Sequence, residues 1–244
     1  MEIIIILGVL IGMVAGFFGV GGGALLVPIL MFMGYSIQEA VGISILQMFI
    51  SSATGSFLNY KSKKLDISIV LYLGLGALVG GFLSPYVVLH SSTLFLELLF
   101  LTFILLAFVK FIYTPAQSTA EKKGSPWLLS FVGGVTAMLS SSIGIGGAIL
   151  LTPFLNAYMG FELKKATAAS LLFILFSSFA GTISWVLTGA LLYREGLILG
   201  FSSIIGVWLG LYFTHKVNVK TFKVLLLLLY VVVLIYIVNK IFFS

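Results

Sequence analysis

Cysteine is absent from the sequence, and charged residues are scarce. The 244 residues include no cysteine, which excludes disulfide bonds and cysteine-ligated metal sites. Charged residues make up 8% of the chain, whereas an ordinary soluble domain has about 25%. Hydrophobic residues account for 61%, and the mean hydropathy is +1.24. This composition excludes an ordinary soluble domain and predicts an all-α polytopic membrane protein without a separate soluble domain.

Ionisable side chains are also missing from the interior of the predicted membrane spans. Glu97, about one turn into its helix, is the exception. The chain shows no nucleophile–base pair, metal-ligand cluster or cofactor motif. We therefore predict that it is not an enzyme, has no catalytic or metal-binding residues and uses no cofactor. Its glycine strings lack the strand, lysine and acidic partner that a nucleotide-binding loop requires.

The net charge of +6 arises from thirteen basic and seven acidic residues. The basic residues fall in short loops between apolar runs, a distribution typical of membrane topology signals rather than of nucleic-acid binding. The N-terminus carries Glu2 and lacks the basic region of a signal peptide, so we interpret it as the first membrane segment.

Glycine is concentrated in two short stretches inside apolar runs. Residues 16–28 read GFFGVGGGALLVP, and residues 144–153 read GIGGAILLTP. Six of ten positions are identical between 19–28 and 144–153. Glycine lets the backbone turn, and in a membrane the freed polar groups must be satisfied inside the protein or by water in a cavity. Matching glycine-interrupted segments in two halves of a chain indicate the binding site of a transporter.

The similarity between the two halves extends beyond the glycine stretches, which are themselves related by a shift of 125 residues. A shift of 126 residues brings glycine onto glycine and serine onto serine along most of each half. The matched pairs include Gly34/Gly160, Ser44/Ser170, Ser51/Ser177, Gly55/Gly181, Gly74/Gly200 and Gly80/Gly206. We therefore predict two repeats, 1–113 and 126–244, joined by a cytoplasmic linker at 114–125.

The first apolar run of each repeat is too long for one membrane crossing and too short for two, because a crossing needs about 20 residues. We predict that each is a re-entrant helical hairpin that turns at its glycines, over 3–33 and 126–159. Three transmembrane helices follow each hairpin. Their predicted ranges are 37–60, 67–89 and 94–113 in the first repeat, and 163–192, 197–214 and 222–238 in the second.

The distribution of lysines favours these hairpins. With both runs as hairpins and the N-terminus outside, eleven basic residues are cytoplasmic, and only Arg194 and Lys240 are outside. With both runs as ordinary crossings, the best division is 8 against 5. The cytoplasmic set is Lys61, Lys63, Lys64, Lys110, Lys122, Lys123, Lys164, Lys165, Lys216, Lys220 and Lys223. By the positive-inside rule we predict hairpins, which make the repeats inverted and place both termini outside.

The helix that follows each glycine turn would begin near the middle of the membrane. A helix N-terminus offers unpaired N–H groups and about half a positive charge, which suits an anion. Serine and glutamine side chains of the turns and of the following helices would add donors. The candidate substrate-binding residues are Gly19, Gly21, Gly22, Gly23, Gln47, Ser51, Ser141, Ser142, Gly144, Gly146, Gly147 and Ser177. For the scattered small residues, such as Ser44 and Gly55, helix packing is the alternative interpretation.

At these residues the chain resembles the sulfite exporter TauE/SafE family, also called the 4-toluene sulfonate uptake permease family. The resemblance rests on the two glycine motifs, on AVGISILQMFISSATG at 40–55 and on the two-half layout. It implies a small carrier in the inner membrane of a bacterium or archaeon, for sulfite, sulfonates or sulfoacetate. The chain departs from the family pattern at Ala148, where the first copy has Gly23, and at Asn59 or Tyr60, where a histidine is expected.

The sequence thus predicts a secondary transporter for small sulfur-containing anions, exporting them by alternating access as the two halves rock. An anion channel with the same pore and a carrier of an unrelated small anion are the alternatives. The expected partners are the small anionic substrate and membrane lipid, without nucleic acid, and a homodimer stays open.

Overall fold

The computed structural model describes residues 2–61, 67–113 and 124–243. The described chain is helical throughout and contains no strand, which confirms the all-helical fold class. The helices are α1 (Glu2–Phe18), α2 (Gly23–Phe32), α3 (Ile37–Lys61), α4 (Ile67–His90), α5 (Thr93–Tyr113), α6 (Pro126–Ser141), α7 (Ala148–Ala157), α8 (Leu163–Thr188), α9 (Tyr193–Lys216) and α10 (Val219–Phe243).

Within the described residues, five helices are long and apolar enough to cross a membrane. These candidate spans are Ile37–Lys61, Ile69–His90, Leu163–Thr188, Tyr193–Thr214 and Val219–Lys240. The shorter apolar stretches are Glu2–Phe18, Gly23–Phe32, Pro126–Ser141, Ala148–Ala157 and Thr93–Leu106, the last being the first part of α5. The protein is therefore a multi-pass membrane protein.

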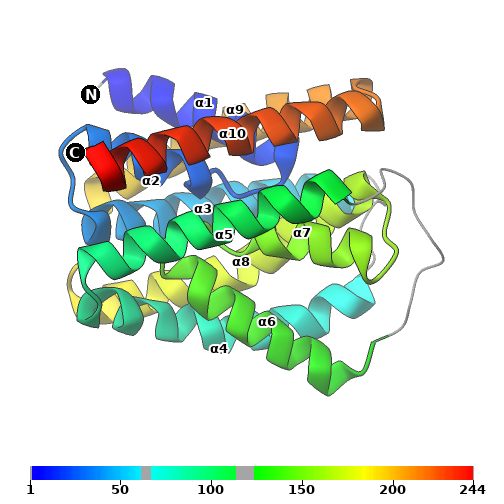
Figure 1. The fold of residues 1–244 in the computed structure, drawn as a ribbon, viewed down its shortest axis with the longest axis horizontal. Coiled ribbons are helices and arrows are strands. Elements are labelled where there is room, and N and C mark those ends of the chain that lie inside the picture. The colour runs from blue at the N-terminus through cyan, green and yellow to red at the C-terminus, as the bar shows by residue number, and fades with distance from the viewer. Residues whose placement is uncertain (1, 62–66, 114–123, 244) are drawn as a thin grey trace.

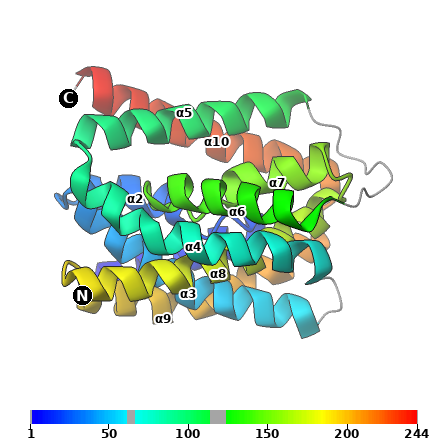
Figure 2. The ribbon, with the colours of Figure 1, turned by 90° about the horizontal axis from the view of Figure 1, so that it is seen from below.

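The packing partners of the first half recur in the second with the halves exchanged. Helix α1 packs along α9, and correspondingly α6 packs along α4. Helices α3 and α8 contact each other in the centre, and α3 also packs on α9 as α8 does on α4. Helices α5 and α10 form a pair that covers the short helices α2 and α7, as Figure 2 shows. Both chain termini lie at the same end of the molecule (Figure 1).

Glycines allow the closest of these helix contacts. A Cβ atom added at Gly12 of α1 would clash with the carbonyl oxygen of Ser203 in α9, and one at Gly206 would clash with that of Val9. The matching pair α4–α6 behaves in the same way, because a Cβ atom at Gly76 would clash with the carbonyl oxygen of Ser130. Small residues let membrane helices approach backbone to backbone, and here they join helices from different halves.

Three helices differ from the sequence-based expectation by three residues or more at one end or both. The helix expected over 222–238 runs from Val219 to Phe243. The helix expected over 163–192 ends at Thr188, because Gly189 adopts a left-handed conformation with φ +69° and caps it. The next helix begins at Tyr193 rather than at 197, and its first turn includes Glu195, whose charge is favourable near a helix N-terminus. Gly189 is a single glycine inside an apolar run, so it gave no clear boundary signal in the sequence.

The described lysines lie mainly at one end of the molecule. Helix α3 ends at Lys61, α8 begins near Lys164 and α9 passes to α10 near Lys216, all at the end opposite the chain termini (Figure 1). Arg194 in the first turn of α9 and Lys240 in the last turn of α10 belong to the other end. Outside the described residues lie Lys63, Lys64, Lys122, Lys123 and the linker residues 114–123.

Candidate functional site

The two glycine segments, residues 19–23 and 144–147, follow the same backbone course. Each contains three glycines with positive φ, a conformation that other residues rarely adopt. The φ angles are +67°, +71° and +81° at Gly19, Gly21 and Gly22, and +71°, +74° and +90° at Gly144, Gly146 and Gly147. Gly23 is absent from this set, and its counterpart is Ala148. The second copy therefore has a non-glycine residue at a position where positive φ is not required.

The first N–H groups of α2 and α7 are buried and unpaired. Residues 19–24 and 144–149 are all buried. In the part of the chain that the structure describes, no protein acceptor pairs with the N–H groups of residues 21–24 or 146–149, and hydrogen bonding resumes at Leu25 and Leu150. Buried backbone donors almost always have a partner. These two sets of donors are therefore candidates for a ligand.

The two segments contact each other directly. A Cβ atom at Gly23 would clash with the carbonyl oxygen of Gly144, so this glycine is required by the close approach of the segments. The Ser44 hydroxyl, on α3, donates a 2.9 Å hydrogen bond to the same carbonyl oxygen. On α8, the Ser177 hydroxyl lies 3.4 Å from the carbonyl oxygen of Gly146. Helices α3 and α8 thereby hold the second segment in place.

Gln47 and Ser141 have buried polar atoms without a partner. The amide oxygen and nitrogen of Gln47 and the hydroxyl of Ser141 make no hydrogen bond to any described residue, and both side chains are 0% exposed. Gln47 lies on the face of α3 between Ser44 and Met48, which both contact the glycine segments. An unpartnered buried polar group costs about 1–3 kcal/mol. A polar ligand at the segments would remove this cost.

The structure brings the predicted glycines together, with Ser141 and Ser177 beside them. Gln47 lies on α3 next to Met48, which contacts both segments. The hydroxyls of Ser177, Ser51 and Ser142 are already bonded to backbone, and that of Ser177 donates to the Ile174 carbonyl oxygen at 3.1 Å. Ser51 donates to the Met48 carbonyl oxygen at 3.2 Å. Ser142 donates to the carbonyl oxygen of Met138 at 2.7 Å and lies 3.4 Å from that of Ser84. The Ser51 and Ser142 hydroxyls stabilise the local helix packing in this conformation.

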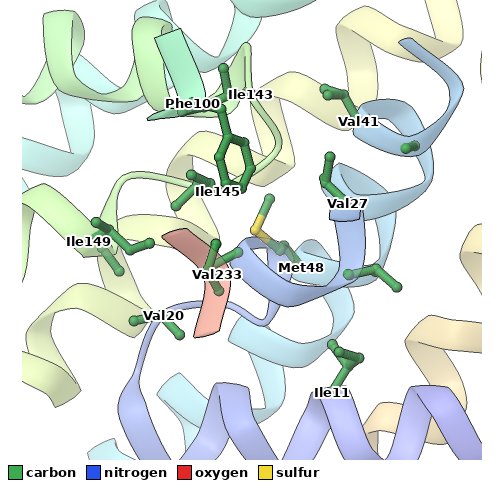
Figure 3. Packing of buried hydrophobic residues seen from close by; sticks show 14 of the residues in the cluster. Ile11, Val20, Val27, Val41, Met48, Phe100, Ile143, Ile145, Ile149 and Val233 are labelled. Carbon is green, nitrogen blue, oxygen red and sulfur yellow. The ribbon is translucent and has the colours of Figure 1, made fainter. Parts of the chain in front are cut away.

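The sequence-based candidates missed two apolar residues that meet both segments. A Cβ atom at Gly21 would lie 3.0 Å from Met48 Sδ and 3.0 Å from Ile174 Cδ1. A Cβ atom at Gly146 would lie 2.8 Å from Met48 Sδ and 3.1 Å from Ile174 Cγ2. The two residues match under the shift of 126 positions, which is the signal that could have identified them. Figure 3 shows Met48 among buried side chains that include Val20, Ile145 and Phe100.

Few charged groups lie near this centre. Among the buried residues of the described ranges, Glu97 is the only charged one. Its carboxylate is 4.0 Å from the Lys240 ammonium, which joins α5 to α10. No group of three or more His, Cys, Asp or Glu within the described residues could hold a metal ion.

Long apolar helices, and two short ones that start at buried glycine segments in the centre, define a multi-pass helical membrane protein. The family model described as sulfite exporter TauE/SafE matches residues 4–237, nearly the whole chain. The chain belongs to this family and is a membrane transporter.

Relatives of similar length are named as membrane transporters, not as enzymes. A probable membrane transporter protein of Methanocaldococcus jannaschii is 29% identical, with 93% of this chain and 91% of the relative covered. The probable membrane transporter protein YunE of Bacillus subtilis is 25% identical, with 90% of each chain covered. No solved structure matches the chain.

Proposed function

We propose that this protein exports small sulfur-containing anions, such as sulfite, a sulfonate or sulfoacetate, by alternating access. The observation that carries the proposal is the pair of buried, unpaired N–H sets at residues 21–24 and 146–149. Gln47 and Ser141 add further donors without partners. Family membership supports the choice of a sulfur-containing anion.

The electrostatics of the site favour an anion. Each short helix directs about half a positive charge from its N-terminus toward the glycine segments. The donors belong to the backbone, so an anion could be held without a lysine or arginine, and the buried described residues include neither. A cation would meet N–H groups where it needs oxygen acceptors, which disfavours a cation carrier.

The proposed membrane arrangement has two inverted repeats in the inner membrane of a bacterium or archaeon. Helices α1–α2 and α6–α7 would be re-entrant hairpins, and both termini would be outside. The exchange of packing partners between the halves supports inversion. The location of both termini at one end, opposite the end of α3, supports the hairpins (Figure 1).

The direction of transport follows from the membrane potential. An interior negative by about 100 mV favours exit of a monovalent anion by about 2.3 kcal/mol. Export therefore needs no coupled ion, which agrees with a glycine-segment site that has no carboxylate of its own. Uptake would need coupling, for which Glu97 and Glu39 are the available carboxylates.

The test is transport of sulfite and organic sulfonates by the purified protein in liposomes. A carrier gives saturable flux and counterflow, whereas the channel alternative gives non-saturating flux without counterflow. We expect Gly22→Ala and Gly147→Ala to reduce transport at least about tenfold, the effect of losing one hydrogen bond to a charged group of about 1.5–3 kcal/mol.

Gly189→Ala is the matched control for these variants. Gly189 also has positive φ, +69°, but nothing lies within 4 Å of an added Cβ atom, and the residue lies outside the glycine segments. If Gly22→Ala and Gly147→Ala transport sulfite as well as Gly189→Ala does, the glycine segments are not the anion site.

A further inference from the structure

Met48 and Ile174 form a matched apolar pair at the centre of the molecule. They lie on α3 and α8 at positions related by the repeat shift, since 48 plus 126 is 174. Both side chains are 0% exposed. Each is among the nearest neighbours of Gly21 and of Gly146, so the pair joins the two glycine segments.

The residues around this pair are also apolar. Val20 and Ile145, the non-glycine residues within the two segments, are each 1% exposed and belong to the same buried cluster as Met48 and Ile174. Phe100 of α5 and Val233 of α10 belong to the same cluster (Figure 3). The unpaired N–H donors are thus separated from water by apolar side chains.

This apolar closure is a barrier to an anion. An anion that used donors from both glycine segments would have to occupy space beside Gly21 and Gly146 that Met48 and Ile174 fill. Apolar constrictions exclude water and ions and are one of the ways in which membrane pathways are closed. A pair of side chains that fills this space can act as a gate when one of them moves aside.

The two members of the pair differ in how easily they can move. Methionine is unbranched and flexible, whereas isoleucine is restricted at χ1 in a helix. Their neighbours differ as well, because the unpartnered Gln47 on α3 is matched by Phe173 on α8. Phe173 is packed against Gly147, with its Cε1 2.5 Å from an added Cβ atom. Movement is therefore assigned to Met48, beside the residue whose amide lacks a partner.

We infer that Met48 and Ile174 are the gate of the anion site, closed in this conformation and opened when Met48 moves aside. Opening would bring the Gln47 amide and both N–H sets to one anion. This inference rests on the proposed function, because it takes the glycine segments to be the anion site.

The experiment measures passive chloride leak from liposomes that contain the purified full-length protein. Met48→Gln keeps the length of the side chain but makes it polar, and we expect it to raise the leak rate at least about tenfold over the wild type, because a polar side chain hydrates the constriction. Met48→Ala and Ile174→Ala should also leak. Met48→Leu, which stays apolar and similar in volume, should leak less than Met48→Gln.

Met31→Ala is the matched control. Met31 is 8% exposed and lies eight residues after Gly23, about 12 Å farther along α2 at 1.5 Å per residue. It should leak no faster than the wild type. Size-exclusion profiles and melting temperatures identify variants that fold. The Met48→Gln and Met48→Leu pair keeps the test decisive even where Met48→Ala does not fold.

Leak rates of Met48→Gln and Ile174→Ala equal to that of Met31→Ala would overturn the gate. Equal leak from Met48→Leu and Met48→Gln would show that the apolar nature of the side chain at position 48 is not what blocks the ion. Chloride leak does not depend on the natural substrate, so the two proposals can fail separately. If the wild type shows sulfite counterflow and the Met48 and Ile174 variants do not leak chloride, the gate is rejected and the proposed function stands. Leaky variants of a wild type that carries no sulfur-containing anion support the gate and reject the proposed substrates.

Discussion

Gly22 and Gly147 differ from most other glycines of the chain in the reason for which glycine is needed. Their φ angles of +81° and +90° turn the backbone into α2 and α7. Gly12 and Gly76 have no such backbone requirement and instead allow two helix backbones to meet. Substitutions at the first kind change the direction of the chain, whereas those at the second kind separate two helices.

Gln47 should limit stability while supporting function. Replacing it in Gln47→Leu removes two buried polar atoms without partners, so we expect the protein to gain about 1–3 kcal/mol in stability and its melting temperature to rise. Sulfite counterflow should fall, because a donor at the site is lost. Both quantities can be measured on the same purified preparation.

Ser44→Ala is the contrasting variant for this prediction. Its hydroxyl already has a partner, the Gly144 carbonyl oxygen, so the substitution should lower the melting temperature. A Gln47→Leu protein that melts below the wild type would show that the amide stabilises the fold, and Gln47 would then be a packing residue.

Sequence reasoning at this scale named candidate donors but not which of them already have partners in the fold. It identified the glycines, Gln47 and Ser141, because polar or flexible residues contrast with an apolar helix. It could not separate Ser141 from Ser142, because a helical serine can bond to a carbonyl of its own preceding turn according to its χ1 angle. Met48 gave no contrast at all, because it is one apolar residue among many.

At the scale of single elements, the interruptions of the helices follow from local sequence. Helix α1 ends at Phe18, directly before Gly19, and α6 ends at Ser141, three residues before Gly144; both glycines have positive φ. The partners of these helices do not follow from sequence in the same way. Gly133 and Gly134 are equivalent in the sequence of α6, yet only the structure shows which of them faces α4 closely.

These adjacent glycines provide a matched test of the α4–α6 contact. A Cβ atom at Gly133 would clash with the carbonyl oxygen of Leu73, whereas one at Gly134 would lie 3.3 Å from that of Gly76. We expect Gly133→Ala to destabilise the protein by about 1–3 kcal/mol, the usual cost of overpacking. Gly134→Ala should cost much less, and both gain the same helix propensity. Melting temperatures in one detergent check this, and equal losses would contradict a tight backbone contact at Gly133.

At the scale of the whole molecule, composition was sufficient to predict a multi-pass helical membrane protein. The orientation in the membrane is still a prediction from lysine positions. In this cysteine-free chain, single variants Lys61→Cys and Arg194→Cys can be compared with a membrane-impermeant thiol reagent on intact cells. Arg194→Cys should be labelled in intact cells, and Lys61→Cys only after lysis. The reverse pattern would place the termini in the cytoplasm and remove the charge argument for the hairpins.

The way in which the halves interlock could not be predicted, because apolar and glycine residues do not specify their partners. The Thr214 hydroxyl of α9 donates to the Phe17 carbonyl oxygen of α1 at 2.8 Å. The Ser130 hydroxyl of α6 donates to the backbone carbonyl oxygen of Tyr72 in α4 at 2.9 Å. Both bonds join helices from different halves, in the pairs that glycines bring backbone to backbone.

Contacts between α3 and α8 are of a different kind. An added Cβ atom at Gly55 would lie 3.0 Å from Leu171 Cδ1, and one at Gly42 would lie 3.4 Å from the Trp185 ring. These neighbours are side chains, which can change rotamer as helices slide, whereas abutting backbones cannot. If the protein alternates between two states, α1 should therefore move together with α9 rather than with α4.

Distances between spin labels can show whether α1 moves with α9, its backbone-contact partner, or with α4, which belongs to the same half of the sequence. Ile6 on α1, Phe201 on α9 and Tyr86 on α4 are 61%, 61% and 68% exposed, so labels attached there should not disturb the packing. On addition of sulfite, the distance between labels at Ile6 and Phe201 should stay constant, and that between Ile6 and Tyr86 should shift. If the two halves of the sequence moved as rigid bodies, the opposite would be seen, because α1 and α4 belong to one half and α9 to the other. A shift confined to the Ile6–Phe201 pair would therefore show that the backbone contacts of α1 with α9 separate during transport.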